Sequence, residues 1–399
     1  MSHIAITGIG VIAPGAIGVD AFRSLLRSGE SAIGDVDRFD TAGLSAHRAA
    51  LVRNFNPRDF IPPMKMRRMN ALSRFAVSAV KLALDDRGGD PPGANTGVAI
   101  GTAFGPVQTS VDYMREYVEK GAALAPPQLF AESVANAPGS HIAIEHGLRG
   151  FNVTVTQRES SALAAAMYAS AQLVKGTVRA ALFGGVEEVN EMIFSVLDRI
   201  GALAHSNGAV DERSRPFDRR RNGLVLGEGA AAFTLESSPA HEPYAYISGF
   251  GMSRDTTASI SDWGSDHNAV VRAMRAAIDD AGIEPSMVDA IYASANSSQR
   301  ADRLEYLAIQ SLFAPVPPVV ATKGYFGEYA AGGALQVAAA VLAMSDQTLH
   351  ASAGFERADD EMRFEPIPES RGIALDNILV NSISAGGGIV SMVLSRESK

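Results

Sequence analysis

The sequence predicts an α/β fold made of two similar halves, and three observations favour it. Short runs of β-branched residues alternate with long amphipathic stretches, which is typical of parallel βα units. This order of elements runs through the chain twice. The 399 residues have room for two core-sized units, and 46% hydrophobic with 20% charged residues is the composition of an ordinary globular α/β protein.

The first cycle of elements lies in the N-terminal half. The predicted strands are residues 4–6, 97–101, 151–156 and 178–183. The predicted helices are residues 69–84, where apolar residues recur three and four apart, and the alanine-rich residues 160–174. Glycines predict where elements end: the first strand turns at Gly8 and Gly10, the last strand turns at Gly184 and Gly185, and the second helix stops at Gly176.

A weaker second cycle begins near Tyr244. Its predicted strands are residues 245–249, 288–294 and 389–394, and its predicted helices are residues 268–281 and 331–344. The short segment 236–243, which contains two prolines, is the only plausible seam between the cycles. The sequence therefore predicts two pseudo-duplicated domains, residues 1–239 and 240–399.

Composition and charge exclude several classes of function. A net charge of −9 argues against nucleic-acid binding. Because the chain has no cysteine, it has no disulfides, no thiolate metal sites and no cysteine nucleophile. No pair among its eight histidines has metal-ligand spacing supported by a third ligand, so neither a metal nor a cofactor is expected.

The chain carries no visible targeting or membrane segment. Its N-terminus opens directly into a strand pattern without a basic and apolar leader, so no signal peptide is expected. No apolar run reaches the ~18 residues that a membrane span needs, and a cytoplasmic location is expected. The basic run Arg219-Arg220-Arg221 is a candidate patch for docking an acidic partner.

Four stretches resemble the β-ketoacyl-acyl carrier protein synthases, and they extend along nearly the whole chain. They are residues 141–150, 215–229, 321–327 and 381–388. The second stretch begins Arg215-Pro216-Phe217-Asp218 and ends Gly-Glu-Gly, and it is long and specific. The resemblance implies the thiolase-like fold, in which the two pseudo-duplicated halves form a layered αβαβα architecture.

The resemblance also implies a catalytic cysteine, which takes up the acyl chain, and two histidines that help to decarboxylate the malonyl thioester and to stabilise the enolate. Counted from the flanking motifs, these three positions hold Glu159, Ser294 and Glu328. The family's lysine is retained as Lys323. Gln157 offers another register for the cysteine position, but Glu159 needs no gap to the motifs that follow.

Without these three residues, the sequence resembles the chain-length factors of type II polyketide synthases. The resemblance implies a subunit without condensing activity that pairs with a Cys-bearing ketosynthase and shapes its acyl tunnel. The further partner implied is an acyl carrier protein with a phosphopantetheine-linked polyketide, polyene or fatty acyl chain. Two alternatives remain open: a stand-alone acyl-thioester decarboxylase or hydrolase that uses Glu159 and Glu328 as an acid–base pair, and a homodimer that only binds acyl chains.

Glu159 is expected at the start of a helix. Unpaired backbone N–H groups and the positive end of the helix dipole favour a carboxylate there. We hypothesise that Glu159 plugs the dead site and pairs with Lys323. The alternative is an ordinary helix-start glutamate that points to solvent.

Residues 106–120 predict a helix that the resemblance places at the far end of the acyl tunnel. Val107, Ser110 and Met114 are three and four residues apart and therefore share one face. Val107 and Ser110 are small, so a deep tunnel and a long acyl chain are expected. The aromatic residue that gates the family's pocket is replaced by Ala385. The alternative is that this helix face is buried in the core or in a dimer interface without touching substrate.

Overall fold

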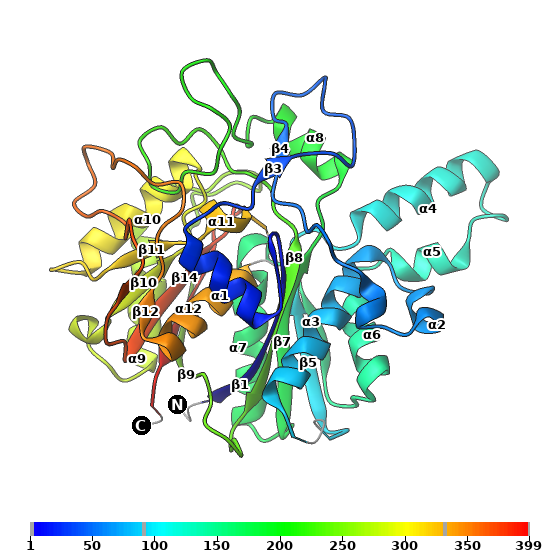
Figure 1. Cartoon of the computed structure of the whole chain (residues 1–399), viewed down its shortest axis with the longest axis horizontal. Coiled ribbons are helices and arrows are strands. Elements are labelled where there is room, and N and C mark those ends of the chain that lie inside the picture. Colours follow the sequence, from blue (N-terminus) through cyan, green and yellow to red (C-terminus); the bar gives the residue numbers. More distant parts are fainter. Residues whose placement is uncertain (1–3, 90–92, 330–332, 398–399) are drawn as a thin grey trace.

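A single mixed β-sheet runs through the molecule (Figure 1), a computed structural model that describes residues 4–89, 93–329 and 333–397. Its strands lie in the order β11-β10-β14-β15-β9-β1-β8-β7-β5-β6. The strands of the first half are β1 (Ile4–Ala13), β5 (Thr96–Gly101), β6 (Asn152–Val155), β7 (Ala180–Glu187) and β8 (Gly229–Glu236). Those of the second half are β9 (Ala245–Arg254), β10 (Ala290–Ala293), β11 (Val319–Ala321), β14 (Asn377–Ile383) and β15 (Gly388–Ser395).

Helices follow the strands in the order that the sequence predicts. The helices of the first half are α1 (Val19–Ser28), α2 (Pro63–Met66), α3 (Ala71–Arg87), α4 (Val107–Lys120), α5 (Pro127–Glu132), α6 (Ala137–His146), α7 (Ser161–Val174) and α8 (Glu191–Arg199). Those of the second half are α9 (His267–Asp280), α10 (Gln299–Leu312), α11 (Lys323–Phe326) and α12 (Ala334–Asp346). Five further strands have two residues each. They are β2 (Ala16–Ile17), β3 (Gly34–Asp35), β4 (Arg48–Ala49), β12 (Thr348–Leu349) and β13 (Arg371–Gly372).

The two halves repeat one strand arrangement. In the first half β5 pairs in parallel with β6 and β7, β7 pairs antiparallel with β8, and β8 pairs antiparallel with β1. In the second half β10 pairs in parallel with β11 and β14, β14 pairs antiparallel with β15, and β15 pairs antiparallel with β9. Strands β1 and β9 join the halves. This repetition supports the predicted pseudo-duplication; the boundary between residues 239 and 240 stays a prediction.

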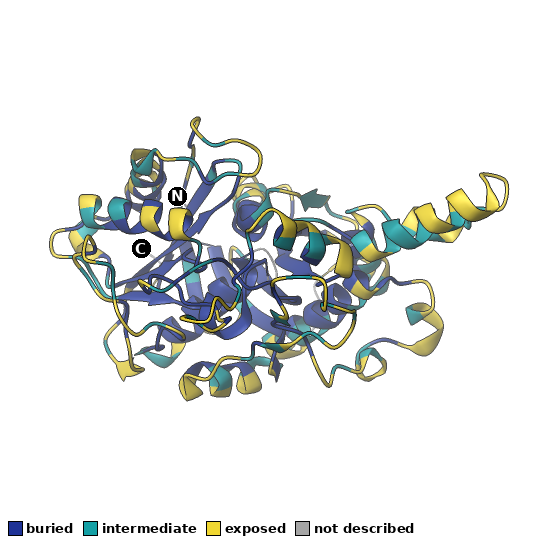
Figure 2. Ribbon diagram, turned by 90° about the horizontal axis from the view of Figure 1, so that it is seen from above, coloured by how far each residue is buried: buried dark blue, intermediate teal, exposed yellow. Residues whose placement is uncertain are grey.

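The helices form layers around the two halves of the sheet. The middle layer is made of α7 and α12, which both contact strands of the two halves. Both of these helices are rich in alanine and almost entirely buried. On the outer faces, α3 packs with α6, and α9 packs with α10. The layered α/β fold that the sequence predicts is therefore confirmed, and the dark blue core in Figure 2 follows the strands and the middle helices.

The glycines of the first strand do not turn the chain, which corrects the prediction for Gly8 and Gly10. Strand β1 continues through both residues to Ala13, with an irregularity in its pairing with β8 between Ile6 and Gly8. A Cβ on Gly8 would lie 2.3 Å from the carbonyl oxygen of Ala83, and one on Gly10 would lie 1.9 Å from that of Ala79. The glycines are therefore needed because helix α3 lies directly on the strand.

The second half repeats this close packing. Strand β9 extends five residues beyond its predicted end at Gly249 and passes through Gly251. A Cβ on Gly251 would lie 1.9 Å from the carbonyl oxygen of Ala273 in α9, the same distance as at Gly10. The predicted turn at Gly184 and Gly185 is also wrong, because β7 continues through both residues. The predicted helix 331–344 is found as α12; residues 331 and 332 lie outside the described residues.

None of the helices in the described residues is both long and apolar enough to cross a membrane.

The packing of α3 on β1 leads to a stability prediction. We expect Gly10→Ala to lower the free energy of unfolding by about 1–3 kcal/mol, because the new methyl group must displace the backbone of α3. Chemical denaturation of the two proteins measures this difference. The matched control is Gly43→Ala, since Gly43 is exposed and a Cβ there meets nothing within 4 Å. Equal losses of stability in both variants would contradict the close packing.

Candidate functional site

Glu159 lies at the junction between a strand and a helix. Strand β6 ends at Val155, and residues Arg158–Ser160 form a single turn that leads into α7. Arg158 in this turn has a φ of 48°, a left-handed conformation that few residues other than glycine adopt. The sharp turn directs Glu159 inward, where it is fully buried. The alternative that Glu159 points to solvent is therefore wrong.

The carboxylate of Glu159 is held from the second half of the chain. Its Oε2 accepts a hydrogen bond from the backbone N–H of Ala385, at 3.1 Å, in the loop between β14 and β15. Its Oε1 is buried without a hydrogen-bond partner. The N–H of Ser160, at the start of α7, donates instead to the hydroxyl of Ser384. The sequence leads us to expect that N–H groups at the start of the helix bond to the Glu159 carboxylate. The structure shows instead a donor 226 residues further along the chain, the N–H of Ala385.

Lys323 forms a buried ion pair with Glu328. The Nζ of Lys323 lies 2.7 Å from Oε2 of Glu328, and it also donates to the backbone carbonyl of Ser294 at 2.8 Å. Both side chains are almost fully buried. The predicted pairing of Glu159 with Lys323 is thus corrected, because the lysine's ion-pair partner is Glu328.

The other contacts of Glu328 come from residues that the sequence argument missed. Its Oε2 also accepts from the side-chain amide of Asn296 at 2.7 Å, and its Oε1 accepts from the backbone N–H of Tyr329 at 2.8 Å. Both oxygens of Glu328 are therefore occupied. Asn296 and Tyr329 lie two residues and one residue from predicted positions, and proximity in sequence was the one available signal for them.

Each polar atom of Ser294 already has a hydrogen-bond partner within the protein. Its hydroxyl accepts a hydrogen bond from the N–H of Ile383 at 2.9 Å, and its own N–H donates to Glu305 at 2.9 Å. Its carbonyl accepts from Lys323. The structure thus joins Ser294, Glu328 and Lys323 by direct contacts, and the charges of Glu328 and Lys323 act on Glu159 without a direct contact among the described hydrogen bonds.

Burial changes the acidity of Glu159. Loss of water, and after it the negative charge of Glu328, raise the pKa of its carboxyl from 4.5 to about 8. The positive charge of Lys323 and the side chain of Tyr329 oppose this rise. At neutral pH the side chain is therefore largely protonated, so Glu159 is a buried neutral acid.

Other buried carboxyls support the loops around this cluster. Burial raises the pKa of Glu187 to about 8, and two N–H groups of the loop after β5 donate to this carboxyl. Burial also raises the pKa of Asp302 to about 6, while the N–H groups of Phe217 and Asn296 bond to it. Both carboxyls accept bonds from backbone and hold turns in place, which is a structural role.

The specific block that begins at Arg215 holds the fold, as the sequence analysis expects. Asp218 is fully buried and accepts hydrogen bonds from the backbone of residues 356 and 357. In the neighbouring basic run, Arg219 is exposed while the other two arginines have ion pairs, so docking of an acidic partner there stays a prediction. Arg221 is 5% exposed and pairs with Asp359, and Arg220 pairs with Asp218 and Glu356.

Helix α4 confirms the helix predicted over residues 106–120, and it projects from the body of the protein. No residue of α4 is buried, and α4 and α5 form an arm that extends away from the sheet (Figure 2). Val107 and Ser110 are half-buried at the base, where the Ser110 hydroxyl donates to the carbonyl of Ser133, and Met114 is exposed. This face is therefore not part of the core of the chain. Of the two alternatives to a tunnel-lining role, burial in the core is excluded, and burial in a dimer interface stays open.

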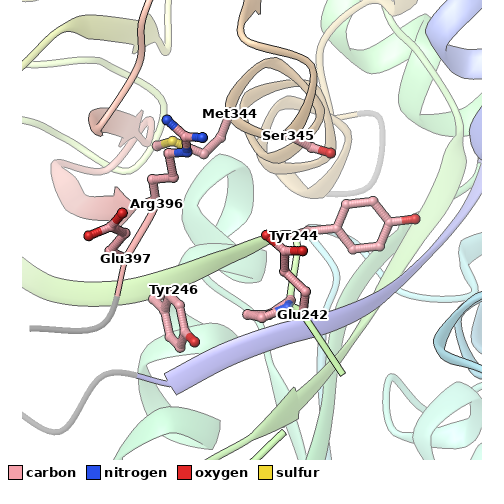
Figure 3. Close-up of a pocket in the computed structure, with 8 residues that line it drawn as sticks. Glu242, Tyr244, Tyr246, Met344, Ser345, Arg396 and Glu397 are labelled. Atoms are coloured by element: carbon pink, nitrogen blue, oxygen red, sulfur yellow. The ribbon is translucent and has the colours of Figure 1, made fainter. Parts of the chain in front are cut away.

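A surface hollow of about 720 Å³ lies elsewhere, at the seam between the halves (Figure 3). Its lining includes Glu242, Tyr244, Met344 and Arg396, and none of the predicted site residues. Among the residues that the structure describes, no group of three or more acidic or histidine side chains is arranged to hold a metal ion.

Comparison with known proteins points to one family. The family model "Beta-ketoacyl synthase, N-terminal domain" matches residues 1–241, and "Beta-ketoacyl synthase, C-terminal domain" matches residues 244–356. A 3-oxoacyl-[acyl-carrier-protein] synthase 2 of Coxiella burnetii is 28% identical over 408 residues, 99% of this chain and 98% of its own length. The tetracenomycin polyketide synthase ketoacyl synthase alpha subunit of Streptomyces glaucescens is 30% identical over 418 residues, 99% of this chain and 97% of its own.

Solved structures agree with the sequence comparison. A structure described as the ishigamide ketosynthase/chain length factor superimposes with a TM-score of 0.89 at 26% identity, and each chain is covered to 99%. A β-ketoacyl synthase from Burkholderia phymatum gives the same TM-score and identity over the whole of both chains.

The raised pKa of Glu159 leads to a prediction of pH dependence. The unfolded chain loses this proton near pH 4.5 and the folded protein loses it near pH 8. Between these values the folded state binds more protons, so its stability falls as the pH rises, by up to about 1.4 kcal/mol per pH unit for this group. We expect Glu159→Gln to remove this contribution, so that Tm falls less between about pH 6 and about pH 9 than in the unmodified protein.

Thermal unfolding at several pH values measures the effect. The control is Glu30→Gln, which changes an exposed glutamate. The same pH profile in the Glu159→Gln variant and in the unmodified protein would show that Glu159 is ionised in the folded state across this range.

Proposed function

The chain belongs to the β-ketoacyl synthase family, and from this premise we propose that it is a chain-length-factor-like subunit without condensing activity of its own. It would pair with a Cys-bearing ketosynthase and shape the tunnel for a chain that grows on an acyl carrier protein. The growing chain on the carrier protein is a polyketide, a polyene or a fatty acyl chain. The proposal also places the protein in the cytoplasm.

The observation that carries the proposal is the closed, thiol-free cluster at the expected catalytic position. Glu159, largely protonated, stands where a nucleophile would stand, and neither Ser294 nor Glu328 supplies an imidazole. An acyl-glutamate anhydride would lie uphill of a thioester and would hydrolyse. Covalent transfer of an acyl chain from the carrier therefore has no productive route at this centre.

Two surfaces support pairing with another subunit. Strand β6 ends the sheet and, among the described residues, pairs on one side only, with β5, so its outer edge is open to another strand. The α4–α5 arm exposes large apolar side chains, among them Met114, Tyr117, Val118 and Phe130. Exposed apolar surface on a projecting arm is typical of an interface. A heterodimer would cover both features.

The same arm supports a role in chain length. Val107, Ser110 and Met114 lie along one face of α4, from its base to its exposed part. If the partner's acyl tunnel reaches this face, the small side chains at the base leave room for a long chain. The gate position, Ala385, is likewise small, and its backbone N–H is engaged with Glu159.

A stand-alone acyl-thioester decarboxylase or hydrolase is the competing proposal. It is favoured by the position of Glu328, whose charge raises the pKa of Glu159, as expected for an acid–base pair. It is opposed by the contacts of Glu328, because both carboxylate oxygens already bond to Lys323, Asn296 and the Tyr329 backbone. We therefore favour the non-catalytic subunit.

Co-expression with a Cys-bearing ketosynthase tests the proposal. We expect native mass spectrometry to find a one-to-one complex that elongates an acyl carrier protein substrate, while the chain alone leaves malonyl and acyl thioesters intact. Glu159→Cys in the isolated chain should restore no condensation, because the two imidazoles are still missing. Turnover by the unmodified chain alone, lost in Glu159→Gln, would overturn the proposal in favour of the competing enzyme.

The role of the arm in chain length has a separate test. We expect Ser110→Trp in the assembled complex to shorten the product, because the indole occupies the base of the α4 face. Mass spectrometry of the carrier-bound products measures the length. Glu119→Trp is the matched control, since Glu119 is exposed on the opposite face of the same helix. Products of equal length from both variants would contradict a tunnel-lining role for this face.

A further inference from the structure

A second cavity lies beside the first turn of α4, where Gln108 is part of its wall. Its volume is about 520 Å³, within the range of small-molecule sites. The loop after β3, the start of α3, the first turn of α4 and the turn before α8 all contribute to its wall. None of the residues expected at the catalytic centre or along the tunnel lines it.

Aromatic rings form the apolar part of the wall. Phe39, Phe55 and Phe75 line the cavity. The rings of Phe55 and Phe75 lie 5.1 Å apart between centroids, and Phe55 also stacks on Phe60. These contacts hold the rings in place before any ligand arrives, so an apolar body can bind against them at a small cost in ordering.

Two side-chain donors at this cavity have no acceptor. The Nε of Arg74 and the Nδ2 of Asn190 are both buried without a hydrogen-bond partner. Asn190 is 5% exposed, and its Oδ1 is already used to accept from the N–H of Ile193 at the start of α8. The amide group is thus held in one orientation by its cap, and its remaining donor lacks the partner that buried polar groups normally have.

The cavity is lined by two arginines, Arg38 and Arg74, and by three glutamates, Glu188, Glu191 and Glu228, of which Glu191 is exposed to solvent. Arg38 pairs with Glu228, with 2.6 Å between Nη2 and Oε1. Arg74 has no ion pair within the described residues, and its one hydrogen bond is a long one, 3.4 Å, to the carbonyl of Met66. Glu188 faces the same space, but burial raises the pKa of its carboxyl to about 7, which weakens its repulsion of an anion.

We propose that this cavity binds a small monocarboxylic acid, with its apolar body against the phenylalanine rings and its carboxylate bonded to Arg74 and Asn190. A carboxylate has two acceptor oxygens and matches a guanidinium in shape and charge. The body of the acid is an aromatic ring or a short alkyl chain, and both satisfy the same wall. The site is independent of the proposed function, since it shares no residue with the acyl tunnel or the dead catalytic centre.

Calorimetric titration of the full-length chain with cinnamate and with octanoate tests the proposal. We expect saturable binding of at least one of them at one site per chain. Binding of cinnamate alone would assign an aromatic body, and binding of octanoate alone would assign an alkyl body. No saturable binding of either acid would overturn the proposal.

Two variants locate the binding site. Arg74→Met keeps the apolar stem and removes the guanidinium, and we expect it to weaken binding about tenfold or more. Asn190→Asp keeps the acceptor that caps α8 but replaces the unpaired donor by an oxygen, so it should weaken binding to a similar degree. Circular dichroism and Tm of each variant show whether it is folded.

The control variant is Arg68→Met, which removes an exposed arginine nearby that does not line the cavity. We expect its affinity for either acid to equal that of the unmodified chain. If Arg74→Met and Asn190→Asp are folded and bind as tightly as the control, the acid binds elsewhere and the assignment of this cavity is wrong.

Discussion

The buried ion pair between Lys323 and Glu328 is the interaction on which the central cluster depends. Lys323 lies at the start of α11 and ties that helix to the carbonyl of Ser294, while Glu328 ties it to Asn296. Removal of one partner from such a pair typically costs about 3–5 kcal/mol, because the other charge is left uncompensated without water. The pair also influences the protonation of Glu159, whose pKa is raised first by burial and then by the charge of Glu328. Because Lys323 forms its ion pair with Glu328, the buried carboxyl of Glu159 has no ion-pair partner among the described residues and stays largely protonated at neutral pH.

The same cluster fastens the halves of the chain to each other. Glu159 and Ser160 belong to the first half, and their partners Ala385, Ser382 and Ser384 belong to the loop and strand that close the second half. In a working member of the family this junction would carry the chemistry. Here hydrogen bonds between the two halves cross this junction, with the largely protonated Glu159 at its centre, so the junction joins the halves structurally. A subunit with this joint can still present a surface to a growing chain, because the α4 face lies outside the cluster.

Sequence patterns located most strands of the sheet and five of the helices, α3, α4, α7, α9 and α12, but they missed strands β8, β11 and β14 and helices α1, α6, α8 and α10. They also failed where a glycine had two possible roles. At Gly8, Gly10 and Gly184 the pattern predicts a turn, yet each residue lies inside a continuous strand. The physical reason is the approach of a neighbour's backbone, 1.9 to 2.4 Å from where a Cβ would be. A sequence does not distinguish a glycine needed for a positive φ in a turn from a glycine needed because a neighbouring backbone lies too close for a Cβ. The packing of α3 on β1 is visible only in three dimensions.

The sequence by itself determined the family, the repeated α/β order and the absence of a thiol and of imidazoles at the expected positions, because these follow from residue identity and spacing along the chain. It could not determine which charged side chains would form ion pairs in the folded protein. The partner of Lys323, the donor that holds Glu159 and the internal pairing of Arg220 and Arg221 were decided by tertiary structure, since each joins segments that are distant in sequence or depends on burial. The ionisation of Glu159 was decided the same way: a carboxyl's identity is written in the chain, but its pKa depends on the water and charges that folding leaves around it.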